Sequence, residues 1–572
     1  MKILGFVRRS FFILPFLFIS LLSFCDAPRL TVIFVVDQFA YSYINKLKPF
    51  FKGGLKLFLD EGVVYENAYY PHAMPATATG HAALATGVFA KNHGVIGNKW
   101  YNPDGKMVTF PTDSKKNAAV FDRDGNPLNY GRSSHRVMVP GLSDQLILHP
   151  YSQATNHSFA ISIKDRSAIA MAGSLGKAIW FDDSQGCFTT SKAYFGEVPG
   201  WVSEFNKKKK IWDMKRYKWN TAYYLKNNPA YAFKNIDNYK YVAGHKRIAG
   251  TEIELLSNDK ESGEYNGDGA YEKFCYLPIA NRMLLDLAES CIDTILKKAK
   301  RQDKIMVWIS LSSLDKLSHL FGPDSLEAID MVYHIDKLLR RFMRRLHKRI
   351  RKKDVLFALT ADHGTDPIPE LLQDDGFKKA IRIDTTAFVK KMNRMLTNDY
   401  GVDNFVAGFK SPQFFFDHRI FDDLKPDVKQ RIISGFKEFL LKQPGIKNVW
   451  TYDELKKADF ASQSIESFYK NQLYPGRSGY LSVQVYPYCQ ASKYKTGTGH
   501  RNPYEAVTHV PLMFYRKGEV EKKIVRDRVN MLQFANTIAQ MLEIPRLPAS
   551  VFNILPGLSF QAARSDEALA LG

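Results

Sequence analysis

The sequence predicts an α/β protein built around a mostly parallel central sheet. Three short apolar runs, rich in β-branched residues, have the unbroken hydrophobic pattern of strands buried on both faces: Leu30–Val36, Ile305–Leu311 and Val355–Thr360. Amphipathic helical patterns cover residues 279–300 and about 324–351. With 572 residues and a hydrophobic content of 45%, the chain is long enough for a large core and one to three domains.

Further core strands are predicted over residues 63–69, 159–163 and 508–515, and a final core helix over 531–542. Between these segments the periodic pattern loosens twice, which indicates two insertions. The predicted division of the chain is a signal segment at 1–25, core at 26–190, 281–370 and 496–560, insertions at 191–280 and 371–495, and a tail at 561–572. Within the second insertion we expect helices near 385–396 and 425–442 and a strand at 480–486.

The N-terminus has the pattern of a targeting segment. Lys2, Arg8 and Arg9 precede an apolar stretch at residues 11–24, which is too short for a comfortable membrane span. The letters before Cys25 (Leu-Ser-Phe-Cys) resemble a loose lipobox. We therefore expect an exported protein, either free in the periplasm or anchored through a lipid at Cys25 to a membrane facing it.

The formal net charge of +22 suggests an attraction to anions. Basic residues concentrate at 207–210 and 340–353, but no nucleic-acid motif accompanies them, so the second run is interpreted as the solvated face of a helix. The charge is compatible with small phosphate esters or anionic lipid as partners, and we expect no specific nucleic acid. Four more cysteines lack the close spacing of a zinc site and can form two disulfides, in three possible pairings, or stay free: Cys187, Cys275, Cys291 and Cys489.

Potential metal ligands follow the predicted strands. Asp37 comes after the first strand, and Asp362 and His363 end the strand at 355–360. Asp315 and His319 are four apart on a predicted helical turn, so they share a face and can chelate one metal ion. Sites in open α/β sheets gather at the carboxyl ends of strands, where these residues lie.

A loop of small residues around Thr77 contains a candidate nucleophile. A helix is predicted to begin at residues 82–85, with Thr77 just before it, where unpaired backbone N–H groups favour an anionic oxygen. The alternative is that Thr77 or Thr79 only caps the helix. Lys164 and Arg166 follow the strand at 159–163; on an extended segment they would point the same way and clamp one anion, or simply be solvated.

These residues, taken in order with His500 in a glycine loop, resemble the alkaline phosphatase superfamily. The resemblance is strongest to its threonine-nucleophile branch, which includes phosphate-irrepressible alkaline phosphatases and nucleotide pyrophosphatase/phosphodiesterases. The matching motifs are Val36-Asp37-Gln38, Thr77-x-x-Gly80-His81, Thr86-Gly87, Gly94-Val95-Ile96-Gly97-Asn98, Lys164-Asp165-Arg166, Asp315-x-x-x-His319, Ala361-Asp362-His363-Gly364, Gly499-His500 and His509-Val510-Pro511. The resemblance implies a three-layer sandwich with both insertions over the active site.

The resemblance also implies a role for each site residue. One zinc ion would be held by Asp315, His319 and His500. The other would be held by Asp37, Asp362 and His363, with Thr77 as its exchangeable ligand and as the nucleophile. The phosphoryl oxygens would be contacted by Asn98, Lys164 and Arg166. The chain departs from the family at Thr79, where proline is usual; the four-residue offset to His81 and the distance to Asn98 favour Thr77 as the nucleophile.

The implied activity is zinc-dependent hydrolysis of phosphomonoesters through a phosphothreonine intermediate. A phosphodiesterase or nucleotide pyrophosphatase would use the same two-zinc site, but the Lys-x-Arg pair accompanies monoesterases in this superfamily. A non-catalytic exported binding protein would more readily have lost a ligand, and none is missing. A sulfatase is disfavoured because neither Cys nor Ser stands at the nucleophile position.

Overall fold

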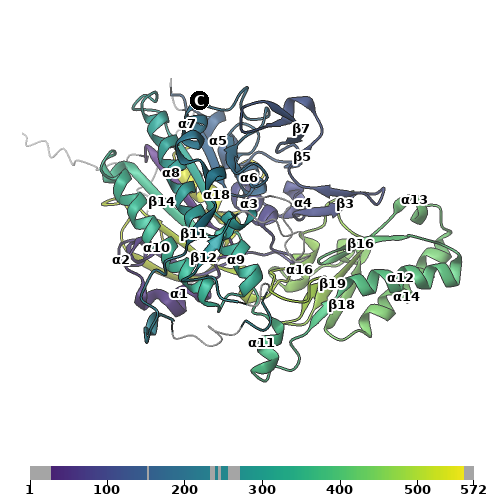
Figure 1. Ribbon diagram of the computed structural model, residues 1–572. Coiled ribbons are helices and arrows are strands. Elements are labelled where there is room, and N and C mark those ends of the chain that lie inside the picture. The colour runs from purple at the N-terminus through teal and green to yellow at the C-terminus, as the bar shows by residue number, and fades with distance from the viewer. Residues whose placement is uncertain (1–26, 151–153, 232–238, 243–245, 256–270, 559–572) are drawn as a thin grey trace, which may run out of the picture. The chain divides into compact units, whose positions relative to one another are not determined.

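The computed structural model describes residues 27–558, except for 151–153, 232–238, 243–245 and 256–270 (Figure 1). The predicted signal segment, Cys25 and the tail at 561–572 lie outside the described residues. No helix among the described residues has both the length and the apolar character that a membrane crossing requires.

The core is a nine-stranded sheet in the order β10-β9-β8-β13-β1-β14-β21-β2-β22. Its strands are β1 (Leu30–Val36), β2 (Val63–Tyr69), β8 (His157–Ser162), β9 (Lys177–Asp182), β10 (Cys187–Thr189), β13 (Ile305–Leu311), β14 (Val355–Thr360), β21 (His509–Tyr515) and β22 (Lys523–Asn530). Only β10 and β21 run against the others. The prediction of a mostly parallel sheet is therefore confirmed.

Two helical layers cover the sheet. Phe34 of β1 pairs in register with Ile309, the neighbour of Trp308, so Phe34 and Trp308 point to opposite faces. The ring of Phe34 lies 5.6 Å from that of Phe342, whereas the indole N–H of Trp308 donates to Ser143 Oγ at 3.1 Å. The helices that contact one another on the Phe342 side are α2 (Gly54–Glu61), α8 (Pro278–Leu296), α9 (Ser313–Phe321) and α10 (Leu326–Leu346), and those on the Ser143 side are α3 (Thr77–Thr86), α5 (Leu142–Leu148), α6 (Asp165–Ala172) and α18 (Phe534–Met541).

Helix α10 confirms the amphipathic pattern predicted over about 324–351, although it is shorter at both ends. Its apolar positions are all buried: Ile329, Val332, Ile335, Leu339 and Phe342. The predicted helix at 531–542 begins as a 3-10 turn, Met531–Gln533, before α18. Strand β22 was not predicted because it is an edge strand with mostly exposed side chains, so its sequence has no apolar run.

Part of the predicted first insertion lies against α10. A two-stranded sheet joins β11 (Arg216–Lys218) and β12 (Glu252–Glu254). Just after β11, the indole of Trp219 and the amide of Ala222 each donate to the buried carboxylate of Asp330, both at 2.7 Å. This carboxylate therefore anchors the segment to the core helix.

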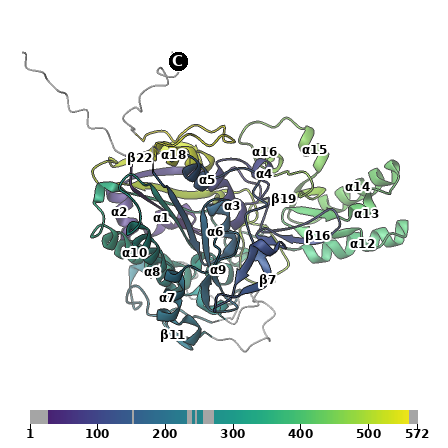
Figure 2. The same ribbon diagram turned by 90° about the horizontal axis from the view of Figure 1, so that it is seen from above.

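The predicted second insertion contains a sheet of its own, in the order β16-β17-β19-β18 (Figure 2). Its elements are α12 (Thr385–Tyr400), β16 (Val406–Lys410), β17 (Gln413–Phe416), α14 (Pro426–Leu441), β18 (Ile446–Thr451) and β19 (Leu481–Val485). These elements share one apolar cluster, with Phe405, Phe416 and Phe436 among its buried members.

Gln472 connects the second insertion to the core, since its side chain accepts from Met74 N at 2.8 Å and donates to Ile96 O at 2.9 Å. The boundaries of both insertions and of the core parts stay predictions.

The cysteines of the described residues are all buried and free: Cys187, Cys275, Cys291 and Cys489. Of the alternatives left open by the sequence, the structure therefore shows free thiols and no disulfide among these four.

Candidate active site

The candidate site lies where the central parallel strands β1, β13 and β14 end, at their carboxyl-terminal side. Asp37 directly follows β1, Asp362 and His363 follow β14, and Asp315 lies in the first turn of α9, just after β13. Because β21 runs antiparallel to β14, the segment that precedes β21 reaches this same edge, and it carries His500. Residues far apart in the sequence are thus brought together by strand direction alone.

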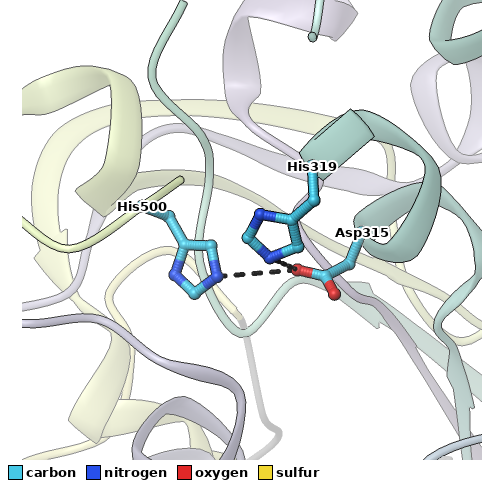
Figure 3. Close-up of side chains that lie close together, drawn as sticks. All are labelled: Asp315, His319 and His500. Carbon is cyan, nitrogen blue, oxygen red and sulfur yellow. Dashed lines mark ion pairs between the residues drawn. The ribbon is translucent and has the colours of Figure 1, made fainter. Parts of the chain in front are cut away.

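Asp315, His319 and His500 form one group of metal-type ligands (Figure 3). Asp315 Oδ1 lies 3.3 Å from His319 Nε2 and 3.6 Å from His500 Nε2. The predicted helical turn is present, because α9 holds Asp315 and His319 one turn apart. Gly497 comes close to this turn with φ of 70°; a Cβ atom there would lie 2.2 Å from His319 O, so the loop requires glycine.

Asp37, Asp362 and His363 form the second group. His363 Nε2 lies 3.6 Å from Asp37 Oδ1 and 3.3 Å from Asp362 Oδ2. All three atoms are buried and make no hydrogen bond, although Asp362 Oδ2 also lies 3.2 Å from His81 Nδ1. Leaving such atoms buried and unsatisfied is costly unless a cation coordinates them, and carboxylate oxygens with imidazole nitrogen are a donor set that zinc accepts. The residues present therefore fit a metal ion.

The three histidines of the two groups are oriented in the same manner. Each Nδ1 lies at hydrogen-bond distance from a backbone carbonyl oxygen, at 2.8 Å for His319, 2.8 Å for His500 and 3.0 Å for His363. A proton on Nδ1 leaves the Nε2 lone pair free for a metal ion. Burial also lowers the pKa of His363 and His500, which favours the neutral imidazole that coordination needs.

Lys164 joins the two groups. Its buried ammonium group donates to Asp37 Oδ2 at 2.7 Å and also to Asp315 Oδ2, and it lies 3.4 Å from Thr77 Oγ1. Burial, together with the charges of Asp315 and Asp362, raises the pKa of Asp37 despite this lysine. Burial alone would also raise the pKa of Asp315, but the charges of Lys164 and His319 outweigh it and hold that pKa well below its ordinary value. The negative charges of these buried carboxylates are thus only partly balanced by Lys164, and additional positive charge would stabilise the site.

Helix α3 begins at Thr77 itself, so the prediction of a helix start at 82–85 was wrong. The N-cap residue is Ala76, and no side chain caps the helix, which also rules out the capping alternative for Thr77 and Thr79. The N–H of Ala78 donates to Asn98 Oδ1 at 2.8 Å. Thr77 lines the cavity of the site, whereas the Thr79 hydroxyl is buried without a partner and lines no described part of it.

The prediction that Lys164 and Arg166 share an extended segment was also wrong. Strand β8 ends at Ser162, and α6 begins at Asp165, so Lys164 is the N-cap residue and Arg166 lies in the first turn. Asp165 explains the difference, because an acidic residue favours a helix start there and its carboxylate accepts from Arg166 N at 2.6 Å. Both side chains nevertheless lie at the candidate site. Lys164 lies 3.4 Å from the hydroxyl of Thr77, and Thr77 and Arg166 line the same cavity.

Two further residues position the site, although no sequence pattern assigned them a role. His81 lies one turn after Thr77 and contacts Thr77 O through Nδ1 at 2.8 Å, Ser310 Oγ through Nε2 at 3.0 Å, and Asp362 Oδ2 through Nδ1 at 3.2 Å. Gln38 has φ of 67°, and it donates from N to Asp362 Oδ1 at 3.1 Å and from Nε2 to Asp315 Oδ1 at 3.0 Å. Both stand inside motifs of the resemblance, which was the only signal for them.

The open part of the site is a cavity of about 380 Å³. Thr77, Asn98 and Arg166 line it together with all members of the first ligand group. Both predicted insertions add to the wall, the first through Glu272 and Tyr276 and the second through residues such as Gln490 and Tyr494. The cavity therefore gives a small molecule access to Thr77, Asn98, Arg166 and the first ligand group.

Comparison with known proteins agrees with this geometry. The sequence profile of "Type I phosphodiesterase / nucleotide pyrophosphatase" matches residues 31–461. The chain belongs to this family. Type I phosphodiesterase/nucleotide pyrophosphatase proteins are part of the alkaline phosphatase superfamily, so the predicted resemblance is confirmed.

Among the similar relatives, alkaline phosphatase PafA of Elizabethkingia meningoseptica is 29% identical over 90% of this chain and 92% of that protein. Alkaline phosphatase PhoV of Synechococcus elongatus is 28% identical over 93% of both. The crystal structure of wild-type PafA superposes with a TM-score of 0.79 at 26% identity, covering 93% of this chain and 99% of that chain. The predicted alkaline-phosphatase-like fold is therefore confirmed for this family member.

Proposed function

We propose that this protein is a phosphomonoester hydrolase of the alkaline phosphatase type, with two zinc ions and Thr77 as nucleophile. One observation supports the proposal most strongly. Two ligand groups and a cavity-lining threonine lie together at the carboxyl ends of the strands, and the ammonium group of Lys164 contacts both ligand groups. Each part has a use in phosphoryl transfer, where catalysis consists mainly of positioning and of stabilising charge on the phosphoryl oxygens.

One ion would be held by Asp315, His319 and His500, and the other by Asp37, Asp362 and His363, with the Thr77 hydroxyl beside them. When bound, such ions act as Lewis acids, which makes a coordinated hydroxyl more acidic and stabilises a departing oxygen. The chain's own residues do the rest. Lys164, Arg166 and Asn98 hold the phosphoryl oxygens, and His81 fixes the turn that carries Thr77 through its contact with Thr77 O.

In the proposed reaction, Thr77 Oγ1 attacks phosphorus while the bond from phosphorus to the leaving oxygen breaks. This step gives a phosphothreonine and releases the alcohol, and a water molecule then attacks phosphorus to release phosphate and restore the hydroxyl. The start of α3 at Thr77 supports this role, because the positive end of a helix dipole favours the developing negative charge.

The relatives support the same proposal. Four of them bear the name alkaline phosphatase: PafA, PhoV, PhoD of Zymomonas mobilis and PhoK of a Sphingomonas species. A solved variant of PafA is substituted at one threonine, one asparagine, one lysine and one arginine. These are the residue types of Thr77, Asn98, Lys164 and Arg166, the four that we assign to nucleophilic attack and phosphoryl binding.

Phosphodiester or nucleotide pyrophosphate hydrolysis is the second candidate, and the family description favours it. It would use the same ligands and the same threonine. The presence of two cations at the phosphoryl position favours monoesters, since a monoester dianion offers one more ionised oxygen than a diester does. A non-catalytic binding protein is disfavoured because both ligand groups and the cavity-lining hydroxyl are in place.

We further propose that the protein acts outside the cytoplasm. It would be either free in the periplasm or anchored, through a lipid at Cys25, to a membrane that faces the periplasm. The basic and apolar pattern of residues 2–24 supports this location.

Activity on a panel of matched substrates tests the proposed function. The purified full chain, loaded with zinc, would be assayed with aryl and nucleotide monoesters and with the corresponding diesters. We expect the larger kcat/KM for the monoester of each pair. A larger value for the diesters would replace the proposal with the phosphodiesterase alternative, and no activity on either class would overturn both.

A further inference from the structure

A strongly basic surface lies where the central parallel strands begin, at the end of the sheet opposite the candidate site. Two segments lead into the strands that flank β1: residues 297–301 precede β13, and residues 348–353 precede β14. Nine of these eleven residues are Lys or Arg, and none is acidic. All nine basic residues are exposed, and we call them the basic face.

Strand register brings the two segments together. Leu30, the first residue of β1, pairs with Ile305 at the start of β13 and with Val355 at the start of β14. Because neighbouring strands lie about 4.8 Å apart, Ile305 and Val355 are separated by only about 10 Å. The segments that lead into them therefore form one surface around the start of β1.

Contacts between the elements hold both segments at this end of the sheet. Arg29, just before β1, donates from Nη2 to Ala299 O at 3.2 Å, which fixes the first segment beside the start of the strand. In the second segment, Arg349 Nη1 lies 3.0 Å from Asp293 Oδ1 in the last turns of α8. The ends of α8 and α10 are therefore joined.

Most of the charge on the basic face is uncompensated. Of its nine members, only Arg349 and Arg351 form an ion pair with a carboxylate among the residues that the structure describes. The nearby Asp303 is buried and accepts hydrogen bonds from two backbone N–H groups. By contrast, Lys517, which follows β21 at the same end of the sheet, lies 2.7 Å from Glu61. Like charges held together repel one another, and an anionic surface bound to them would offset that cost.

We propose that the basic face docks on the surface of a membrane that contains anionic phospholipid. Each Lys or Arg that comes close to such a surface strengthens binding roughly fivefold. The start of the described chain indicates the same partner. Ala27 is three residues before Leu30, at this end of the sheet, and Cys25, the proposed lipid site, is five residues before Leu30. A lipid anchor and the basic face would therefore act on the same side of the protein.

This docking would leave the candidate active site open to substrate. Strand β1 has seven residues, so about 20 Å of sheet separates its start from Asp37 at the site. With the basic face on the membrane, the cavity lies at the far end of the strands. The inference is independent of the proposed hydrolysis, and it gives the proposed location an orientation.

Binding of the purified full chain to lipid vesicles tests the inference. Sedimentation compares vesicles of phosphatidylcholine with vesicles of phosphatidylcholine and phosphatidylglycerol, each at low and at high salt. We expect wild type to bind the anionic vesicles on the order of tenfold more tightly, with a smaller preference at high salt. Residues 1–26 are present in every protein compared, so differences between variants report on the basic face alone.

Two variants, each with four substitutions, locate the binding. The first removes exposed charges of the basic face: Lys298→Gln, Arg301→Gln, Lys348→Gln and Lys352→Gln. The matched control removes exposed charges of the second insertion: Lys390→Gln, Arg394→Gln, Lys425→Gln and Lys447→Gln. The basic-face variant should bind anionic vesicles on the order of tenfold more weakly than wild type, whereas the control should lose about twofold at most.

Equal losses in the two variants would show a general attraction of a basic protein and would overturn the inference, as would a wild type without lipid preference. A DNA duplex provides a further comparison. If the basic-face variant loses binding to the duplex but keeps vesicle binding, the surface serves nucleic acid and the inference is wrong.

Phosphomonoester hydrolysis without vesicles checks each variant independently. Both should keep the wild-type rate, because none of the eight residues lies at the site. If the basic-face variant does not fold, Lys298→Gln with Lys352→Gln replaces it, and we expect a severalfold loss of vesicle binding. A wild type that binds anionic vesicles but hydrolyses no ester would contradict the proposed function and leave the docking surface in place.

Discussion

The imidazole rings of His363 and His500 stack with their centroids 3.6 Å apart and their planes 14° from parallel. The two residues belong to different ligand groups, His363 to that of Asp37 and Asp362, and His500 to that of Asp315 and His319. The groups are therefore neighbours in one site. Such proximity is what a pair of metal ions needs to act together on one phosphoryl group.

We predict that the protein binds two zinc ions, and that the two groups can be emptied separately. His319→Ala should reduce the metal content of the protein to about one ion per chain, because two remaining ligands hold zinc weakly. Asp362→Asn should have a similar effect through the other group. Elemental analysis after dialysis measures this, with wild type as the reference. If both variants keep two ions, or wild type binds none, the assignment of ligands is wrong.

We predict that Thr77→Ala lowers kcat on the order of a thousandfold or more, as expected for the loss of a nucleophile. Thr79→Ala is the matched control, because it removes the same atoms from a threonine two residues further along the chain. The Thr79 hydroxyl has no hydrogen-bond partner, so its loss should cost little. The control should retain most of the activity, and both variants should keep wild-type circular dichroism. Phosphate trapped by acid quenching should map to Thr77, and a label on Thr79 would contradict the proposed mechanism.

We predict that Lys164→Ala with Arg166→Ala lowers kcat/KM for a monoester on the order of a hundredfold or more, since charge-assisted contacts are each worth roughly 1.5–3 kcal/mol. The loss for the matching diester should be much smaller, because it has one ionised oxygen fewer. The ratio of the two kcat/KM values is the measurement. Equal losses would mean that the two cations do not select monoesters. Metal content must be checked in parallel, because Lys164 also contacts Asp37 and Asp315.

The sequence predicted six of the nine core strands, but not β9, β10 or β22, and it placed candidate ligands after the buried strands; their division into two groups came from the family resemblance. Strands such as β1 and β14 are buried on both faces, so their apolar runs are unmistakable, and the residues after them lie at one edge by strand direction. Contacts between side chains and distant backbone have no such pattern. His81 and Gln38 stand out in the sequence only as members of family motifs, and nothing in it indicates that their side chains touch Ser310 and Asp315.

Both errors at the site concern helix starts. The beginnings of α3 and α6 are each defined by the loop before them and by tertiary contacts, such as the bond from Ala78 N to Asn98 Oδ1. Local propensity favoured a later start for α3, since Thr and Gly at 77–80 are weaker helix formers than the alanines that follow. Tertiary contacts outweighed that preference, so Thr77 lies in the first turn of α3 and not in the preceding loop.

Asp366 offers a prediction on stability. It is buried and follows the loop after β14, where its carboxylate accepts a hydrogen bond from Asn502 Nδ2. Burial raises the pKa of Asp366 to about 7, against an ordinary value of 3.8, and the bond from Asn502 only partly opposes this. The folded protein therefore holds a proton on Asp366 that the unfolded chain has already lost between these two pH values.

The sign of the effect follows from this difference in bound protons. Stability from the protonated Asp366 is fully present below pH 3.8 and is lost as the pH rises toward about 7. Asp366→Asn keeps the shape and the neutral charge at every pH, so it serves as the reference that does not titrate. In this window the free energy of unfolding of wild type, relative to Asp366→Asn, should fall by up to about 1.4 kcal/mol per pH unit. Urea unfolding of both proteins at several pH values between 4.5 and 8, with the same zinc concentration, measures the difference, and a difference that does not change with pH would show that Asp366 is ionised throughout.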